Sequence, residues 1–227
     1  TAPTDGQVLT WDNTNSYWKP ATASGGGGGG ITGITFDSNT AASTTGYNAY
    51  YSMAMGSAAS AAGISSIAIG YQAQTLGSRA ISIGYQSGYT GNDQTGLAIG
   101  DRCRTYNGAY YPIAIGYMAE ALGSGAIAIG SGYTQGSTYF QARAGLNAIS
   151  IGKNTYTNST SVAIGDGTYA NGVTSTAIGS GAYASGTNST AIGRLASSTS
   201  ANKFVLGNSS INDLRCQDTS ISSVSDS

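Results

Sequence analysis

The stretch Ile67-Ala68-Ile69-Gly70, followed one unit later by Ile81-Ser82-Ile83-Gly84, decides the fold. In most copies a bulky apolar residue, a small residue, a second bulky residue and Gly follow one another. The phrase occurs eleven times, and its closing glycines lie at 56, 70, 84, 100, 116, 130, 152, 165, 179, 193 and 207. Such a fixed period is typical of a repeat protein.

The spacing of the glycines predicts short strands rather than helices. Six of the ten intervals between closing glycines are 14 residues long, and many units carry a second glycine seven residues after the first. We expect two strands of about five residues in each unit, each ending in a tight turn where Gly supplies a positive φ. The predicted fold is therefore all-β, a parallel β-roll or β-solenoid with rungs of about 14 residues. The second glycines are Gly63, Gly77, Gly91, Gly123, Gly172 and Gly186.

Alternation within the phrase predicts two faces for each strand. We expect the bulky pair, such as Ile113 and Ile115, to fill the interior of the coil, and the small residue, such as Ala114, to face a neighbouring layer. A coil of 14 residues is thin, and one chain alone buries little apolar surface. The sequence therefore predicts self-association, most simply as a homotrimer.

The composition argues against several classes of function. The 227 residues include 8% charged residues and no His, with a net charge of −1, and the cations are scattered singly. We therefore expect no nucleic-acid binding, no membrane insertion, no His-based triad or metal site and no cofactor. Glu120 is the only Glu, and we expect the chain not to be an enzyme. Cys103 and Cys216 have no spacing that suggests a disulfide or a metal site, and both are expected to be free thiols.

The phrase, its period and the Ala-x-x-x-Gly that follows it resemble the head repeat of trimeric autotransporter adhesins. The resemblance covers residues 43–207 and implies a left-handed parallel β-roll with three chains side by side. The units that end at Gly100, Gly116 and Gly152 are longer than the family period, and we expect them to carry loops.

The N-terminal segment has a different pattern. Residues 1–22 contain Gln7-Val8-Leu9-Thr10-Trp11-Asp12 and a second run through Trp18, which predict a hairpin around an Asp-Asn-Thr-Asn turn. This module resembles one found in bacteriophage tail fibres, although a generic hairpin is the alternative. Residues 23–42 form a Gly-rich linker whose six glycines, Gly25 to Gly30, are either a hinge or a short three-chain bundle.

The C-terminal segment, residues 208–227, resembles the lead-in to an endosialidase-type intramolecular chaperone of phage tail spikes and fibres. That family carries a Ser-Asp-x-Arg-x-Lys motif, of which only Ser225-Asp226-Ser227 is present. The resemblance implies that Ser225 matches the cleavage serine, which is unusable here without the Lys base. We predict no catalytic residue in this chain. A coincidental Ser-rich tail is the alternative.

Aromatic residues predict where a ligand could bind. Tyrosines in register with the repeat, among them Tyr71, Tyr85, Tyr156, Tyr169 and Tyr183, are expected to form packing ladders. Others lie in the enlarged units beside arginines, where a scaffold displays loops that suit a sugar. The alternative is that they cover the loops themselves or the trimer seam. The candidate binding residues are Tyr106, Tyr110, Tyr111, Tyr133, Tyr139, Phe140, Arg102, Arg104 and Arg143.

These observations together favour a non-catalytic trimeric tail fibre of a bacteriophage, an extracellular part of the virion. We expect its partners to be other virion tail proteins and, through receptor binding, a bacterial surface polysaccharide or lipopolysaccharide. The alternatives are the head of a bacterial trimeric autotransporter adhesin and a purely structural fibre spacer.

Overall fold

The computed structural model describes residues 7–12, 17–22, 34–37, 51–88, 95–106, 108–135 and 138–211. Two compact units make up the chain, Thr1–Thr32 and Gly33–Ser227. The Gly run of residues 25–30 and the C-terminal residues 212–227, with Ser225 and Cys216, lie outside the described residues.

The first unit is a β-hairpin. Strand β1 (Gln7–Asp12) pairs antiparallel with β2 (Tyr17–Thr22), and Trp11 lies opposite Trp18 in the register. The alternating sequence predicts this pairing, and the hairpin is confirmed.

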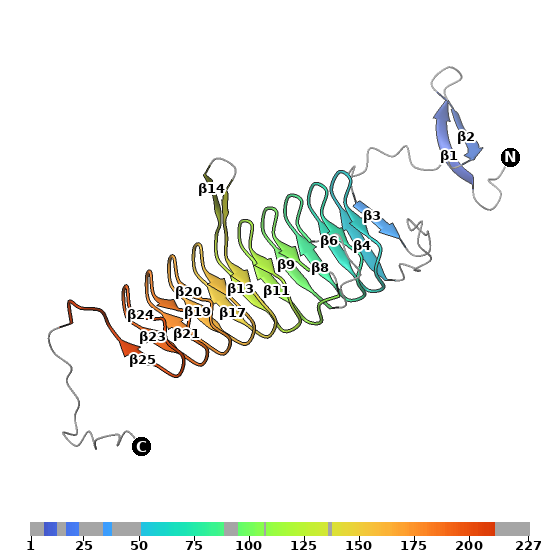
Figure 1. The fold of residues 1–227 in the computed structure, drawn as a ribbon. Coiled ribbons are helices and arrows are strands. Elements are labelled where there is room, and N and C mark those ends of the chain that lie inside the picture. Colours follow the sequence, from blue (N-terminus) through green and yellow to red (C-terminus); the bar gives the residue numbers. More distant parts are fainter. Residues whose placement is uncertain are drawn as a thin grey trace, which may run out of the picture. The chain divides into compact units, whose positions relative to one another are not determined.

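The second unit is a β-solenoid in which most rungs contribute one strand to each of two opposite sides (Figure 1). A 12-stranded sheet, here called the motif sheet, contains the repeated phrase. Its strands pair parallel and in register, so that Ile113 lies beside Ile127 and Ala114 beside Ala128. The exception is β3 (Ile34–Asp37), which pairs antiparallel with the first motif strand. The motif strands are β4 (Ser52–Met55), β6 (Ile67–Ile69), β8 (Ile81–Ile83), β9 (Leu97–Ile99), β11 (Ile113–Ile115), β13 (Ile127–Ile129), β17 (Ile149–Ile151), β19 (Val162–Ile164), β21 (Thr176–Ile178), β23 (Thr190–Ile192) and β25 (Phe204–Leu206).

The opposite side of each rung is a strand of only two residues, here called the short strand. Seven of these strands form one parallel sheet, and β5 with β7 forms a separate pair. The expected strands of about five residues are therefore too long, because the turns use more of each rung than the sequence indicates. The short strands are β5 (Ser60–Ala61), β7 (Gln74–Thr75), β10 (Arg104–Thr105), β12 (Glu120–Ala121), β16 (Arg143–Ala144), β18 (Tyr156–Thr157), β20 (Tyr169–Ala170), β22 (Tyr183–Ala184) and β24 (Ser197–Ser198).

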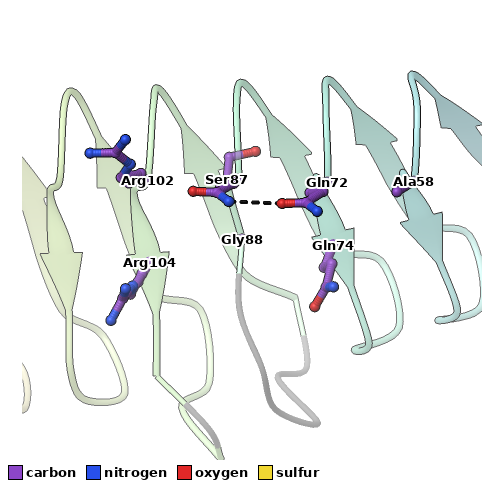
Figure 2. Close-up of a pocket in the computed structure, with 8 residues that line it drawn as sticks. Ala58, Gln72, Gln74, Ser87, Gly88, Arg102 and Arg104 are labelled. Carbon is purple, nitrogen blue, oxygen red and sulfur yellow. Dashed lines mark hydrogen bonds between the residues drawn. The ribbon is translucent and has the colours of Figure 1, made fainter.

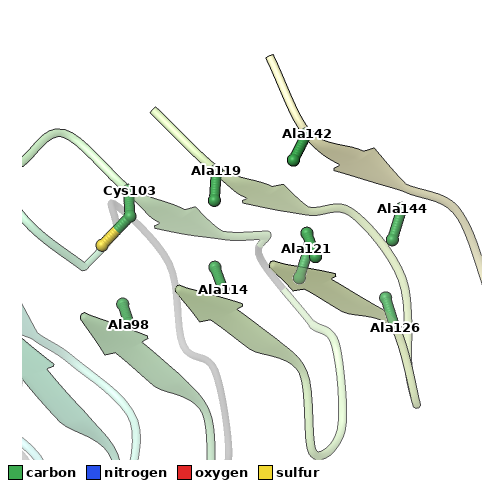
Figure 3. Close-up of a cluster of buried hydrophobic side chains, with 9 residues drawn as sticks. Ala98, Cys103, Ala114, Ala119, Ala121, Ala126, Ala142 and Ala144 are labelled. Atoms are coloured by element: carbon green, nitrogen blue, oxygen red, sulfur yellow. The ribbon is translucent and has the colours of Figure 1, made fainter. Parts of the chain in front are cut away.

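Small side chains fill the interior of the coil, and this overturns the predicted orientation of the phrase. Ala114 and Ala128 are fully buried, whereas the isoleucines on either side of them lie on the outer face of the motif sheet. Figure 3 shows alanines of the motif strands facing those of the short strands, with Cys103 in the same layer. The two sheets of a rung lie too close together for Ile, so the fully buried side chains are small ones such as Ala, Ser, Thr, Cys and Pro.

Many of the buried hydroxyl groups of this interior are hydrogen-bonded within the coil, whereas Thr75 Oγ1 and Ser87 Oγ have no hydrogen-bond partner among the described residues. Ser175 Oγ donates to the carbonyl oxygen of Gly172 at 2.7 Å, and Thr168 Oγ1 donates to that of Gly179 at 2.8 Å. Bonds of this kind allow polar residues to occupy the interior without the cost of an unpaired group.

The closing glycine and, in the units that have one, the second glycine are required for different reasons. The closing glycine of the phrase, for example Gly165, has a φ of +134°, as predicted, and a Cβ there would lie 2.8 Å from the carbonyl carbon of Gly179 on the next rung. The second glycine, for example Gly172, has no positive φ. A Cβ there would overlap the Gly186 carbonyl, so the close approach of the rungs is what requires Gly. Thr174 takes the left-handed conformation instead, with a φ of 55°.

Two of the enlarged units carry the loops that the sequence predicts. A hairpin of β14 (Tyr133–Gln135) and β15 (Thr138–Phe140) projects from the turn that follows Gly130 (Figure 1). A second insertion follows β10 at the opposite turn of its rung and contains Tyr106 and Tyr110. The unit that ends at Gly100 has its extra residues at 89–94, outside the described residues.

Candidate functional site

The predicted binding residues fall in three separate places. Turns that follow a closing glycine form one edge of the solenoid, called here the first-turn edge, and turns at the second glycine form the second-turn edge. Tyr106, Tyr110 and Tyr111 lie at the second-turn edge, where 58%, 53% and 68% of their surfaces are exposed. The backbone N–H of Tyr110 donates to Ser124 Oγ at 3.0 Å, which ties this loop to the next rung.

The projecting hairpin lies at the first-turn edge. Tyr133 at its base packs under Lys153, whose Nζ lies 4.9 Å from the centre of the ring. Tyr139 and Phe140 belong to β15, opposite Thr134 and Tyr133 in the register. The hairpin residues and the tyrosines of the second-turn edge therefore do not form one surface.

Arg104 and Arg143 lie together on the outer face of the short strands. Glu120 stands between them in the ladder, with Oε1 at 4.0 Å from Arg104 Nη1 and Oε2 at 3.7 Å from Arg143 Nε. The Arg143 guanidinium also lies 5.8 Å from the centre of the Tyr156 ring. Tyr156, Tyr169 and Tyr183 continue the ladder with ring centres 6.3 and 6.4 Å apart, which confirms the predicted packing ladder.

Arg102 lies in the turn that follows Gly100, between the outer face of the short strands and the first-turn edge. Its guanidinium lies 5.7 Å from the centre of the Tyr85 ring, its Nη1 donates to Tyr117 Oη at 3.5 Å, and its Nε lies 3.6 Å from Asp101 Oδ1. Tyr85 stacks on Tyr71 with ring centres 5.2 Å apart, again as the ladder prediction requires.

A polar hollow of about 520 Å³ opens beside Arg102 and Arg104 (Figure 2). Gln86 Nε2 donates to Gln72 Oε1 at 2.7 Å along one wall of this hollow. The glutamines are not among the predicted binding residues, although their spacing of 14 residues places Gln72 and Gln86 in one ladder. The lining residues are Ala58, Gln72, Gln74, Gln86, Ser87, Gly88, Arg102 and Arg104.

A second hollow of about 670 Å³ continues from the first. Gln86, Arg102 and Arg104 line both hollows, so the two arginines stand at their junction. The second hollow adds Tyr85, Met118, Glu120 and Gln141. Together the hollows form a groove with amide, guanidinium and phenol groups, which can hydrogen-bond hydroxyl groups and pair with an anion.

Cys103 lies beneath this groove as a free thiol in the interior of the coil. Burial raises the pKa of the thiol from 9.0 to about 11, and Sγ donates to the Gly100 carbonyl at 3.4 Å. A thiol of this kind is a packing group rather than a nucleophile. The described residues contain no group of three metal-ligating side chains and no helix that is long and apolar enough to cross a membrane.

The repeats are similar to a known family. A family model described as the YadA head domain repeat matches residues 48–73, 61–87, 113–132, 157–182, 170–196 and 184–202. Among solved structures, the collagen-binding domain of the Yersinia adhesin YadA is 28% identical, over 70% of this chain and 75% of that one, with a TM-score of 0.47. No curated protein matches the sequence.

The matched repeats confirm the resemblance to adhesin heads over a large part of the solenoid. The chain is an all-β parallel solenoid with rungs of about 14 residues, and part of it is similar to the adhesin-head repeat. The head domains that carry such repeats are non-enzymatic, which agrees with the prediction that this chain is not an enzyme. The tail-fibre and chaperone resemblances stay predictions, since neither match concerns them.

Proposed function

We propose that this chain is the head of a trimeric, extracellular adhesin, in which three solenoids pack through their motif sheets and hold their short strands outward. The observation that carries the proposal is the orientation of the repeated phrase. Alanine points into the coil, and the isoleucines form an apolar face that no described element covers.

The apolar face extends along the whole motif sheet. Twenty of the 22 first and third positions of the phrase are apolar, and the exceptions are Thr176 and Thr190. Ile83 and Ile164 expose 36% and 37% of their surface, and Phe204 exposes 63%. Soluble monomers rarely expose a continuous apolar surface of this size, so the face is expected to be buried against other copies.

The interior of one coil supports the same conclusion. Its largest fully buried side chains are no bigger than Thr, Pro and Cys, so little apolar surface is removed from water within a single chain. A closed assembly of three copies would bury the isoleucine faces around one axis, as the resemblance to trimeric heads implies.

The outer face of the short strands is chemically different. It carries Gln74, Arg104, Glu120 and Arg143, followed by the tyrosine ladder, and it stays in contact with water in the proposed trimer. Three copies of this face on a rigid rod would engage a repetitive surface with raised avidity. The partner is therefore proposed to be a polymer on a cell surface, among which a bacterial polysaccharide or lipopolysaccharide is one choice.

A second candidate is a fibre of a bacteriophage tail. The resemblance of residues 1–22 to a module of bacteriophage tail fibres favours it, and the structure has these residues as the hairpin of β1 and β2 that their alternation predicts. In that case the head would bind a bacterial surface from the outside rather than be displayed by a bacterium.

Adhesion of coated beads tests the proposal. Beads that carry the purified protein are offered two panels of surfaces. Binding to the first panel, immobilised bacterial lipopolysaccharide and capsular polysaccharide, supports the fibre candidate. Binding to the second panel, extracellular-matrix proteins and epithelial cells, supports the adhesin. The variant Ile192→Asp, which places a charge on the apolar face, should lose binding through loss of the trimer. A trimer that binds neither panel would overturn the adhesive role and leave a structural spacer.

A further inference from the structure

We propose that the groove around Gly88 binds an acidic polysaccharide, in which carboxylates pair with Arg102 and Arg104 and the sugar rings lie against the glutamines and Tyr85. The inference deepens the proposed function and rests on it in one respect, since the short strands must face outward in the assembly. The groove itself lies within a single chain.

A missing side chain creates the first hollow. On the outer face of the short strands each rung presents a side chain, as at Gln74, Arg104, Glu120 and Arg143, but the rung between Gln74 and Arg104 presents Gly88. Gly88 has a φ of +87°, and a Cβ there would overlap the Gln74 carbonyl oxygen and Ser82 Oγ. Ser82 Oγ belongs to the interior of the coil, so a Cβ at Gly88 would point inward. This crowding requires Gly, and the outer face of this rung is left without a side chain.

Hydrogen-bonding groups surround the gap. Gln74 and Arg104 stand two rungs apart, about 9.6 Å at the usual strand spacing. Gln72 and Gln86 form the wall toward the first-turn edge, and their mutual bond uses one oxygen and one nitrogen, so each amide keeps a further group for a ligand. The side chain of Gln74 is exposed and has no hydrogen bond within the described part of the chain.

The charges of the groove favour an anion. Glu120 is shared by Arg104 and Arg143, so these three residues carry a net charge of +1. The Arg104 side chain is 61% exposed, and its contact with Glu120 is long, at 4.0 Å. Exposed pairs of this length are weak, so the guanidinium can turn to a carboxylate of the ligand and bind it through two hydrogen bonds.

An aromatic wall flanks these charges. Tyr71 and Tyr85 stack with ring planes 15° apart, and 44% of each is exposed. Tyr71 and the Arg102 guanidinium both lie against the Tyr85 ring, so a sugar meets the exposed edge and the hydroxyl group of Tyr85, which can donate or accept a hydrogen bond. The combination of amide, phenol and guanidinium groups suits a ligand with many hydroxyls and spaced acidic groups better than a nucleic acid, which requires many cations.

The length of the groove points to a polymer. The two hollows extend from Ala58 to Gln141, over six rungs and therefore about 24 Å along the solenoid. A single sugar would fill only part of this length, whereas a chain of uronic acids can place one carboxylate at the junction where Arg102 and Arg104 meet both hollows.

Titration calorimetry with polygalacturonate tests the site, with neutral dextran, dextran sulfate and poly-glutamate as comparison probes at about 0.15 M salt. The protein should bind polygalacturonate and not dextran. Arg104→Gln should weaken polygalacturonate binding about tenfold or more. Arg194→Gln removes an exposed arginine at the first-turn edge of a distant rung and should leave the affinity unchanged.

Several results would overturn the site. An equal loss in Arg104→Gln and Arg194→Gln would show binding by general charge alone. Dextran binding as tight as that of polygalacturonate would remove the role of the carboxylate, and tighter binding of dextran sulfate or poly-glutamate would reassign the ligand to a sulfated polymer or an acidic peptide. The absence of binding by a protein with intact circular dichroism would exclude the site.

Light scattering on the same sample separates this inference from the proposed function. A monomer that binds polygalacturonate through Arg104 would refute the trimeric head and keep the site. A trimer that fails to bind would refute the site and keep the head.

Discussion

Replacement of Ile192 by Asp tests the role of the outward isoleucines. Ile192 lies on the motif sheet between Ile178 and Leu206, and Leu206 exposes 47% of its surface. In an isolated chain an aspartate at this position keeps contact with water, so the solenoid should still fold. In the proposed trimer the same position is enclosed by two further chains.

The magnitude follows from the exposed fraction. Ile192 is less exposed than Ile164 on the same ladder, which leaves 37% of its surface for a partner to cover. Full burial of an isoleucine contributes about 1.5–3 kcal/mol, so the trimer contact contributes at most about 0.5–1 kcal/mol per chain. Loss of this term in three chains costs at most about 2–3 kcal/mol, and enclosure of three carboxylates costs several kcal/mol more. We therefore expect the association to weaken at least about a hundredfold.

A matched variant on the same rung gives the control. Ser197 lies on β24, on the opposite sheet, and is exposed, so Ser197→Asp adds the same charge outside the proposed interface. Sedimentation velocity over a concentration series should show dissociation of Ile192→Asp and an intact trimer for Ser197→Asp. Equal behaviour of the two variants would refute the argument that the apolar face holds the chains together.

Three further predictions concern the coil itself. Ala128→Leu overfills the interior and should lower the free energy of unfolding by about 1–3 kcal/mol or more, with a fall in Tm of about 2–4 °C per kcal/mol. Ala128→Ser should be tolerated, because Ser150 is its neighbour in the ladder. A calorimetric scan that shows no difference between the two variants would contradict the small interior. Gly165→Ala should lower the free energy of unfolding by more than about 3 kcal/mol, because the φ of Gly165 is +134° and a Cβ would strike the next rung. Gly167→Asn should lower it by less than about 1 kcal/mol, since the φ of Gly167 is +62°, its Cβ position is open, and Asn154 occupies the equivalent place. Urea unfolding compares the two variants, and equal losses would contradict the proposed reason for the closing glycine. Cys103 should stay protonated in the folded protein, because burial raises its pKa from 9.0 to about 11. Its contribution to stability should be complete below pH 9 and lost as the pH rises toward 11. Alkylation in a Cys216→Ser variant measures the exposure of Cys103 alone, and rapid alkylation of the folded protein at pH 8 would contradict this burial.

The sequence predicts the solenoid because its period is a direct consequence of the fold. Each closing glycine stacks on the closing glycine of the next rung, as Gly165 does on Gly179, so the positions that require Gly recur once per rung. The tyrosine ladders follow from the same register, which places Tyr156, Tyr169 and Tyr183 side by side. The lengths of the units likewise predict where the hairpin of β14 and β15 is inserted.

The sequence does not reveal which face of the strand is the interior. Alternation shows that Ile113 and Ala114 point in opposite directions, but the hydrophobic effect favours Ile inside unless the space between the sheets is known. The short strands hold the missing signal, since Ala121 and Ala144 face the motif alanines and leave room only for small side chains. Without the residues of the second sheet, the sequence predicts the isoleucines inside and the alanines outside, which is the reverse of the observed orientation.

The candidate site is harder to predict because it depends on an absent side chain. Gly88 does not belong to the repeated phrase, and its effect is visible only when Gln74 and Arg104 are placed on either side of it. Among the predicted residues, Arg102 and Arg104 line the groove, whereas Tyr106, Tyr110 and Tyr111 lie at the second-turn edge. The spacing of aromatic residues along the chain indicates inserted loops, but not which edge of the coil receives them.

The molar mass of the protein in solution tests the central claim most directly. Size-exclusion chromatography with light scattering should give three times the chain mass of 22.7 kDa, together with a circular dichroism spectrum typical of β-structure. A β-folded, soluble species of 22.7 kDa at micromolar concentration would contradict the proposal that the isoleucine faces assemble three chains into an adhesive head.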